Sequence, residues 1–597
     1  MKTQRTTRIN SARGTTARVE AHPIRGRHME MVGLVFIGLC LMALVVSMAS
    51  CGGSAETGLT RFEIDADTQG VIEKVNNIYN TSIVSRDPNV YKAEYEAGFI
   101  QGRLQKDQLV PARDNAWDSA YLLDPTHAYP KQIPPSTDEI AMAQRTLKAN
   151  WDYTMQYIQN TADSQVAGNL RRLMYRLVGI YHGATADQPQ ALPFNEAWVP
   201  EFNDAELSLG YETAGLTFMD LYWINGYADV MYLLPDNAAP STSPAAGTGL
   251  PAGRLVAETA GAASPRGVIP VDRPSKCSAF VLKTADDIFL THNTWNSYLD
   301  QSQATSLWIN GDFMTMNLGA PGYLGSTADF GYTNKGIIFN ETTHRYSYTE
   351  PRADALWMFW RSTLAEQFAS SVEDFFRYIS LEASGTYMSG YMVVDAKTDD
   401  IGYVEMSYKS FVFYKLDGQG GVAVTTKPEG LSTAYDTEMV QGNFILGINF
   451  PASLLVREEL KSVDNRPARR RQFLEQIGGV IDIESAKALI TYIDPANPLS
   501  IYGRWDLGYG ETPAPKTIPD GACDAKAVAA SAIGFAADLE GVLDTKAAAT
   551  AFWMKFGTAD VDGQPFIWST SQWKDQKLRG VPDRVEGDWT LLNLHMR

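Results

Sequence analysis

The cysteines are the residues of this chain whose possible chemistry can best be limited from their positions in the sequence. The 597 residues hold four cysteines, Cys40, Cys51, Cys277 and Cys523. Cys40 lies inside an apolar N-terminal stretch and Cys51 follows it, which leaves two thiols for the folded part. Two remaining thiols of an exported protein usually pair. The alternatives are therefore a Cys277–Cys523 disulfide and a free, reactive Cys277.

The residues after Cys277 predict a β-hairpin that brings other side chains back to it. Two short β-rich runs flank residues 285–287, so we expect them to pair antiparallel across a tight turn. A turn centred between residues 285 and 286 makes the numbers of paired residues sum to about 571, which places residue 277 opposite residue 294. The hairpin thus sets His292 and Trp295 beside Cys277, although buried strand residues of these types are often only packing.

A segment without aromatic residues ends directly at this cysteine. Residues 236–276 are rich in Ala, Pro, Gly, Ser and Thr, so they bury too little apolar area to offset the entropy of ordering. We predict a flexible linker that is removed or cut on maturation. A cut between Lys276 and Cys277 would give Cys277 a free α-amine beside its thiol. An α-amine with a pKa of about 7.7–8.0 is a suitable base for that thiol at neutral pH.

The first 51 residues have the pattern of an export signal. Basic sequence precedes an apolar stretch from Val32 to Met48, and small residues follow it up to Cys51. This pattern predicts a bacterial-type lipoprotein in which Cys51 is lipidated and becomes the first residue. The alternative is an uncleaved anchor helix. We expect an exported protein, held on a membrane by its N-terminal lipid and facing the periplasm or the cell exterior.

Charge and missing motifs exclude several classes of protein. The net charge of −18 argues against a nucleic-acid partner, because phosphate binding needs faces rich in Lys and Arg. The sequence has no Gly-x-Ser-x-Gly elbow, no His-Glu-x-x-His, no Cys-x-x-Cys and no P-loop. A serine lipase of the α/β-hydrolase type, a zinc enzyme and a nucleotide-binding protein are therefore disfavoured. The chemistry expected at Cys277 needs no cofactor and no metal.

Hydrophobic periodicity predicts a helical part, the linker and a mixed body. Apolar residues at three- and four-residue spacing predict helices over residues 91–103, 137–159, 164–181 and 204–222. β-rich runs predict strands at 278–283, 288–292, 306–309, 313–316, 336–339, 391–395, 402–406 and 411–414, with helices near 352–369, 372–379, 454–460 and 486–493. This order predicts an α+β protein. Its parts are the signal (1–51), a mainly helical segment (52–235), the linker (236–276) and the catalytic body (277–597).

Several sequence blocks, in this order, resemble the phospholipase B-like family of N-terminal-nucleophile hydrolases. The blocks are residues 97–102, 277–279, 292–298, 340–343, 384–387, 392–395, 465–469, 504–507 and 520–526. The resemblance spans roughly Tyr91 to the C-terminus, and the block from Cys277 to Trp295 is its most specific part. It implies a four-layer αββα sandwich with a helical N-terminal part, and self-cleavage at the Lys276–Cys277 bond.

The resemblance also implies roles for individual residues. Cys277 attacks an acyl carbonyl while its α-amine relays the proton, and His292 and Trp295 line the pocket. An amide stabilises the oxyanion. The family tends to carry asparagines after residue 387 that this chain lacks, so this role passes to Asn449, Asn340 or a backbone amide. Arg469 is expected near the nucleophile, where it lowers the thiol pKa or orients substrate. The expected substrate-pocket residues are Asn293, Asn340, Thr342 and Thr386.

The resulting prediction is a hydrolase of lipid metabolism. Its expected partner is a small-molecule acyl substrate, with an amide or ester bond in a phospholipid or another acylated compound. Two alternatives stay open. One is a non-catalytic exported lipoprotein that uses the same fold to bind a ligand. The other is a disulfide-bonded scaffold with Cys277 tied to Cys523.

Overall fold

The structure is a computed structural model that describes most of the chain. Described are residues 59–122, 134–233, 277–299, 303–309, 313–417, 420–464, 467–494, 500–504, 519–533, 551–557 and 564–593. All of them belong to one unit, Gly58–Arg597. The predicted signal peptide, with Cys51, and the whole of the predicted linker, with Lys276, lie outside the described residues.

An eleven-stranded sheet forms the larger part of the β structure. Its strand order is β1-β2-β3-β6-β7-β8-β9-β10-β11-β12-β13. The strands are β1 (Thr60–Glu63), β2 (Thr68–Val75), β3 (Ile78–Ser85), β6 (Gln303–Ile309), β7 (Phe313–Gly319), β8 (Phe330–Thr333), β9 (Ile337–Thr343), β10 (Ser389–Asp395), β11 (Asp400–Met406), β12 (Phe411–Leu416) and β13 (Val422–Lys427). β3 and β6 pair in parallel and the other neighbours are antiparallel. Parts of the chain on both sides of Cys277 therefore share one sheet.

A second, seven-stranded sheet carries the predicted hairpin. Its order is β14-β15-β4-β5-β16-β17-β20. The strands are β14 (Val440–Gln441), β15 (Phe444–Gly447), β4 (Ser278–Lys283), β5 (Ile288–Ser297), β16 (Asp520–Ala529), β17 (Ala551–Phe556) and β20 (Thr590–Asn593). In the hairpin Ser278 pairs with Asn293 and Lys283 with Ile288, so the paired numbers sum to 571. The predicted register is confirmed.

The helices surround the two sheets. They are α2 (Val90–Leu104), α3 (Lys106–Leu122), α4 (Thr137–Asn160), α5 (Ser164–Thr185), α6 (Phe218–Val230), α7 (Met358–Phe368), α8 (Val372–Ile379), α9 (Leu454–Leu460), α10 (Pro467–Gln476) and α11 (Ile483–Ile490). The helix predicted over 204–222 is wrong in its first part. Residues 204–217 form turns and loop, because the Asp220 carboxylate binds the backbone N–H groups of Gly210 and Thr217 and caps α6 at Thr217.

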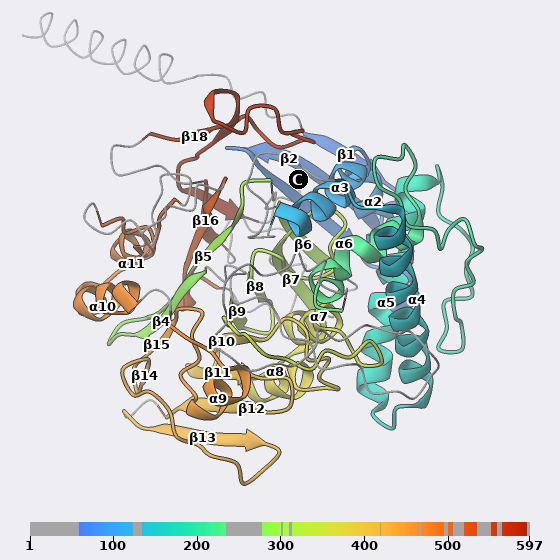
Figure 1. Ribbon diagram of the computed structural model, residues 1–597. Helices are drawn as coiled ribbons and strands as arrows, with labels where there is room; N and C mark the ends of the chain where they lie inside the picture. The colour runs from blue at the N-terminus through green and yellow to red at the C-terminus, as the bar shows by residue number, and fades with distance from the viewer. Residues whose placement is uncertain are drawn as a thin grey trace, which may run out of the picture. The chain divides into compact units, whose positions relative to one another are not determined.

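The sheets face one another and carry helices on their outer sides (Figure 1). β4 and β5 pack against β9, and the Asn340 amide bridges the sheets by donating to the Thr291 carbonyl at 3.0 Å. α7 and α8 lie on the larger sheet, and α11 lies on β5 and β16. The predicted α+β class is confirmed.

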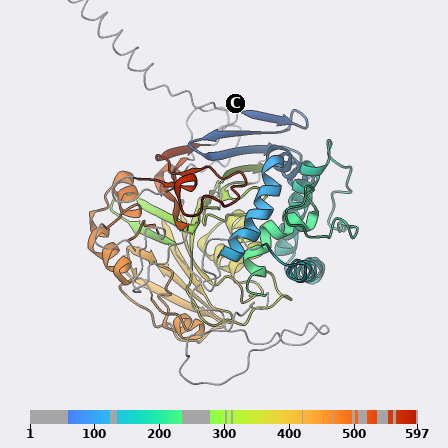
Figure 2. The ribbon, with the colours of Figure 1, turned by 45° about the horizontal axis from the view of Figure 1, so that its top comes forward.

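The described residues before the linker, 59–122 and 134–233, contribute to both the larger sheet and the helical layer. Figure 2 shows β1, β2 and β3 side by side, and α2 packs against all three. α2 also packs closely on α5, where a Cβ on Gly98 or Gly183 would collide with the backbone of the other helix. This segment, predicted as mainly helical, therefore begins with three strands that the sequence analysis did not predict.

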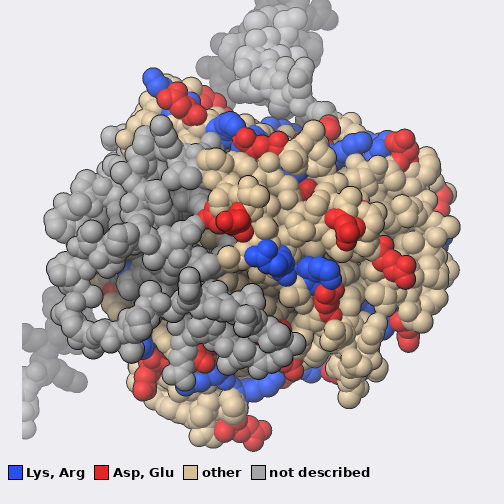
Figure 3. Space-filling model, turned by 45° about the vertical axis from the view of Figure 1, so that its right-hand side comes forward, with Lys and Arg blue, Asp and Glu red and all other residues tan. Residues whose placement is uncertain are grey.

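The surface of the helical side mixes both signs of charge. On the face shown in Figure 3, Lys and Arg are interspersed with Asp and Glu. The described residues on this face therefore form no continuous basic patch of the kind that binds nucleic-acid phosphates. Of the helices in the described part of the chain, none is both long and apolar enough to cross a membrane.

Candidate active site

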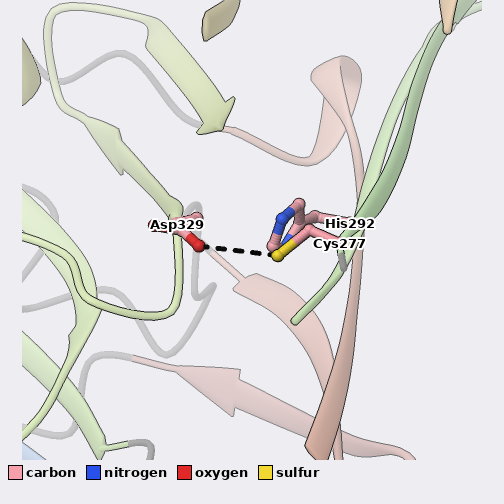
Figure 4. Close-up of side chains that lie close together, drawn as sticks. All are labelled: Cys277, His292 and Asp329. Carbon is pink, nitrogen blue, oxygen red and sulfur yellow. Dashed lines mark hydrogen bonds between the residues drawn. The ribbon is translucent and has the colours of Figure 1, made fainter. Parts of the chain in front are cut away.

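Cys277 stands directly before β4 and faces a cavity between the sheets. The cavity has a volume of about 170 Å³, and Cys277, Thr294 and Trp295 line it. Cys277 is a free cysteine with 5% of its surface exposed. Its Sγ lies 3.9 Å from Oδ2 of Asp329 (Figure 4). The cavity gives this otherwise buried sulfur a space in which a reacting group can sit.

Cys523 likewise forms no disulfide, so the disulfide alternative is wrong. It lies on β16, where the register against β5 shifts between Ala522 and Asp524. Its thiol donates to the carbonyl of Thr294 at 3.3 Å. Cys523 is thus a buried cysteine outside any disulfide.

His292 and Asp329 approach Cys277 from different elements (Figure 4). His292 comes from β5, and Asp329 comes from the loop before β8. A ring nitrogen of His292, a carboxylate oxygen of Asp329 and the sulfur of Cys277 all lie within 4.8 Å of one another, and all three residues are buried. Burial and the nearby Lys526 ammonium hold the pKa of His292 well below its usual value, so the ring is neutral.

Two carboxyl groups and one ammonium group complete the charged surroundings of Cys277. Burial raises the pKa of Asp329 and of Glu341, and each of the two carboxyls affects the other. Lys526 is fully buried, pairs with Asp524 and donates to Oγ1 of Thr294 at 2.6 Å. Burial, and then the Asp329 and Glu341 carboxylates, raise the pKa of the Cys277 thiol, whereas Lys526 lowers it. In the intact chain the thiol is therefore protonated at neutral pH.

Arg469 holds the main chain of Cys277. The guanidinium of this fully buried residue donates to the carbonyls of Cys277 and Ile448, to Oγ of Ser278 at 3.0 Å and to Oδ1 of Asn449 at 3.1 Å. Burial lowers its pKa to about 10. Arg469 does not line the cavity. Its described contacts therefore position the backbone at the nucleophile.

The other predicted site residues lie behind the cavity wall. Asn449 donates its amide to the carbonyl of Thr343, which does line the cavity. None of the four predicted pocket residues Asn293, Asn340, Thr342 and Thr386 is among those that line it. Asn293 binds the Ser278 backbone N–H and two carbonyls, and Thr386 donates to Asp229. The hydrogen bonds of Asn293, Asn340 and Thr386 serve to fasten elements of the fold together.

The cavity wall comes from both sides of the linker. Residues of α6 and of the turn after it, from Asn225 to Tyr232, form one side. Rings and apolar side chains dominate the wall, among them Tyr227, Met231, Tyr323, Met358, Phe359 and Tyr391. Polar groups on the wall include Arg345 and His344. The site is thus incomplete without the segment before the linker.

Neither Asp329 nor a site role for Lys526 is predicted from the sequence. Asp329 lies 52 residues after Cys277 in a loop without a recognisable motif, and its φ of +59° is unusual for a residue other than glycine. Lys526 belongs to one of the blocks that carry the family resemblance, but its place opposite His292 follows only from the pairing of β16 with β5. Neither position could be inferred from local spacing.

Comparison with known proteins shows that part of this α+β chain is similar to one family. The phospholipase B family model matches residues 202–425, which include Cys277, His292 and Asp329. Phospholipase B-like protein A of Dictyostelium discoideum is 26% identical over 279 residues, which is 42% of this chain and 43% of that protein. Phospholipase B-like protein G of the same organism is 29% identical over 142 residues, 21% of this chain and 23% of that protein.

These matches confirm the resemblance to the phospholipase B-like family that the sequence motifs predicted. Each alignment covers less than half of the relative's length.

Proposed function

We propose that this chain is a cysteine N-terminal-nucleophile hydrolase that cuts itself between Lys276 and Cys277. Its proposed substrate is an amide or ester of a phospholipid or of another acylated small molecule. The observation that carries the proposal is the free Sγ of Cys277 at the wall of a cavity between two facing sheets. The order helix, sheet, sheet, helix supports the proposed αββα sandwich.

The proposed reaction uses the two groups of the new N-terminal residue. The α-amine of Cys277 takes the proton from Sγ, and the thiolate attacks the acyl carbonyl. The tetrahedral intermediate then collapses, and the leaving amine or alcohol takes the proton from the α-ammonium. Water, activated by the same amine, hydrolyses the thioester, releases the acid and restores the thiol.

The surrounding residues support this reaction. Arg469 binds the carbonyl of Cys277, so it fixes the direction of the amine and the thiol. We assign the oxyanion donor to Asn449 in preference to Asn340. Asn449 lies behind the cavity residue Thr343, so its amide would turn from the Thr343 carbonyl towards the cavity when it binds the oxyanion. The Asn449 amide binds both Arg469 and the carbonyl of Thr343, a cavity residue, whereas Asn340 is bonded to Thr291 of the other sheet. Donors placed where negative charge develops are the main contribution to such catalysis.

The cavity favours an apolar acyl group. Its wall is rich in rings and thioethers, which gain free energy when they bury an acyl chain. Arg345 and His344 on the same wall offer groups for a polar head. These features support an acylated amine or a phospholipid as substrate, and they fit the amide bond of the first as well as the ester bond of the second.

The place of action is part of the proposal. We propose export, with lipidation at Cys51 holding the protein on a membrane, from the sequence pattern of residues 32–53. A lipid anchor would keep the cavity near acylated substrates. Radiolabelled palmitate incorporated into the wild type and absent from Cys51→Ala would support it, and a protein released without lipid would contradict it.

A substrate panel tests the proposed reaction. Purified protein is incubated with N-acyl amines and with phospholipids, and the released acid is measured. Acid quenching followed by peptide mass mapping should place an acyl group on Cys277. Acid release without any acyl adduct at Cys277 would contradict the mechanism. Tight binding of acyl ligands without turnover would favour the ligand-binding alternative.

A further inference from the structure

We propose that Cys277, His292 and Asp329 form a binding site for a divalent transition-metal ion, Zn²⁺ in particular, and that this ion competes with acyl transfer. Thiolate, imidazole and carboxylate are the three ligand types that Zn²⁺ takes in proteins. Here they come from the start of β4, from β5 and from the loop before β8. These three ligands are too far apart in the sequence to form a linear metal-binding motif.

The distances suit one ion. Zn²⁺ with ligands at about 2.0–2.3 Å in a tetrahedron holds those ligand atoms about 3.3–3.8 Å apart. The three ligand atoms of this cluster lie within 4.8 Å of one another, and Sγ of Cys277 is 3.9 Å from Oδ2 of Asp329. Side-chain rotations that move the ligand atoms by about 1 Å would bring all three to zinc-binding distance. The cavity beside Cys277 leaves room for a water ligand.

The charges also suit a dication. A Cys277 thiolate and an Asp329 carboxylate buried together repel each other and lack water, and an ion of charge +2 neutralises both. The Lys526 ammonium, which would oppose a cation, is already paired with Asp524. The buried Glu341 carboxyl also lies beside Asp329. Metal binding would release the Sγ proton to solvent.

The proposed cut would strengthen the site, and this step rests on the proposed function. A free α-amine and the thiolate of Cys277 can bind one metal ion together in a five-membered ring. His292 and Asp329 would then complete four protein ligands, the number typical of tightly held zinc. Zn²⁺ would occupy both the nucleophile and its base, so metal binding and hydrolysis would exclude each other.

The test uses full-length protein freed of metal with EDTA and then titrated with Zn²⁺ against a fluorescent chelator. One ion should bind per chain, and Cys277→Ser and Asp329→Asn should each weaken binding at least about tenfold. Cys523→Ser, which changes the other buried thiol, should leave binding unchanged. With Co²⁺, a thiolate-to-metal absorption band should appear in the wild type and in Cys523→Ser and be absent from Cys277→Ser.

Two results would overturn the inference: no stoichiometric Zn²⁺ binding by folded protein, or binding that Cys277→Ser leaves unchanged. Unfolding curves of each variant show that a loss of binding is not a loss of fold. Hydrolysis is measured separately in EDTA. A chain that hydrolyses acyl substrates but binds no metal refutes only the metal site, and a chain that shows the cobalt band without hydrolysis refutes only the proposed function.

Discussion

The two buried thiols at the seven-stranded sheet, Cys277 directly before β4 and Cys523 on β16, have similar exposure and different surroundings. Cys277 is 5% exposed and Cys523 is 3% exposed, and neither forms a disulfide. Sγ of Cys277 adjoins a cavity, a carboxylate and an imidazole. The thiol of Cys523 instead donates to the Thr294 carbonyl at a bulge. The comparison shows that burial does not distinguish a candidate nucleophile from a packing residue, whereas the groups and space around the sulfur do.

Substitution of each thiol should give the largest contrast. Cys277→Ala should lower the rate of acyl hydrolysis by at least about a thousandfold, because it removes the proposed nucleophile. Cys523→Ala should retain the wild-type rate within about twofold, since its sulfur does not line the cavity. Steady-state rates on the best substrate of the panel measure both. Comparable losses of hydrolysis rate in Cys277→Ala and Cys523→Ala would contradict the assignment of Cys277 alone as the nucleophile.

Arginine substitution tests how the main chain at Cys277 is held. Arg469→Met should lower the free energy of unfolding by about 3 kcal/mol, because it leaves the carbonyls of Cys277 and Ile448 without donors. The exposed Arg471, two residues away, is the matched control. Arg471→Met should change stability by less than about 0.5 kcal/mol in urea unfolding. Equal effects would contradict the assigned role of Arg469.

Alkylation compares the accessibility of the two thiols. Iodoacetamide should modify Cys277 at least about tenfold faster than Cys523 in folded protein, because only Cys277 adjoins a cavity. Peptide mass spectrometry after timed quenching measures the two rates. Equal rates in urea serve as the control for intrinsic reactivity. Faster modification of Cys523 than of Cys277 in the folded protein would contradict the prediction that Cys277 is the more accessible thiol.

The smallest predicted effect is the loss of stability when Cys523, a packing residue, is replaced by alanine. Cys523→Ala removes one buried sulfur and its bond to the Thr294 carbonyl, so it should cost about 1 kcal/mol of stability. Chemical unfolding with an unchanged m-value would check this. A loss above about 4 kcal/mol would mean that the bulge is central to the sheet.

The sequence predicted those features that depend on local spacing. The turn at residues 285–287 fixed the hairpin register, and the helices α4, α5, α8 and α9 lie within the predicted spans or extend them. Asp329 and Lys526 escaped prediction because tertiary pairing brings them to Cys277. The strands β2 and β3 escaped because their burial does not alternate from one residue to the next, which removes the two-residue period by which a strand is recognised. Loop geometry at Asp220 overrode the apolar spacing before α6.

The central claim is that Cys277 becomes an N-terminal residue whose own amine activates its thiol. Intact mass and N-terminal sequencing of active protein test it most directly. The claim predicts two fragments that co-purify, since β3 pairs with β6 across the linker, with the second fragment beginning at Cys277. Cys277→Ala should stay uncut while Cys523→Ala is cut normally. Full hydrolytic activity in an uncut chain would contradict it.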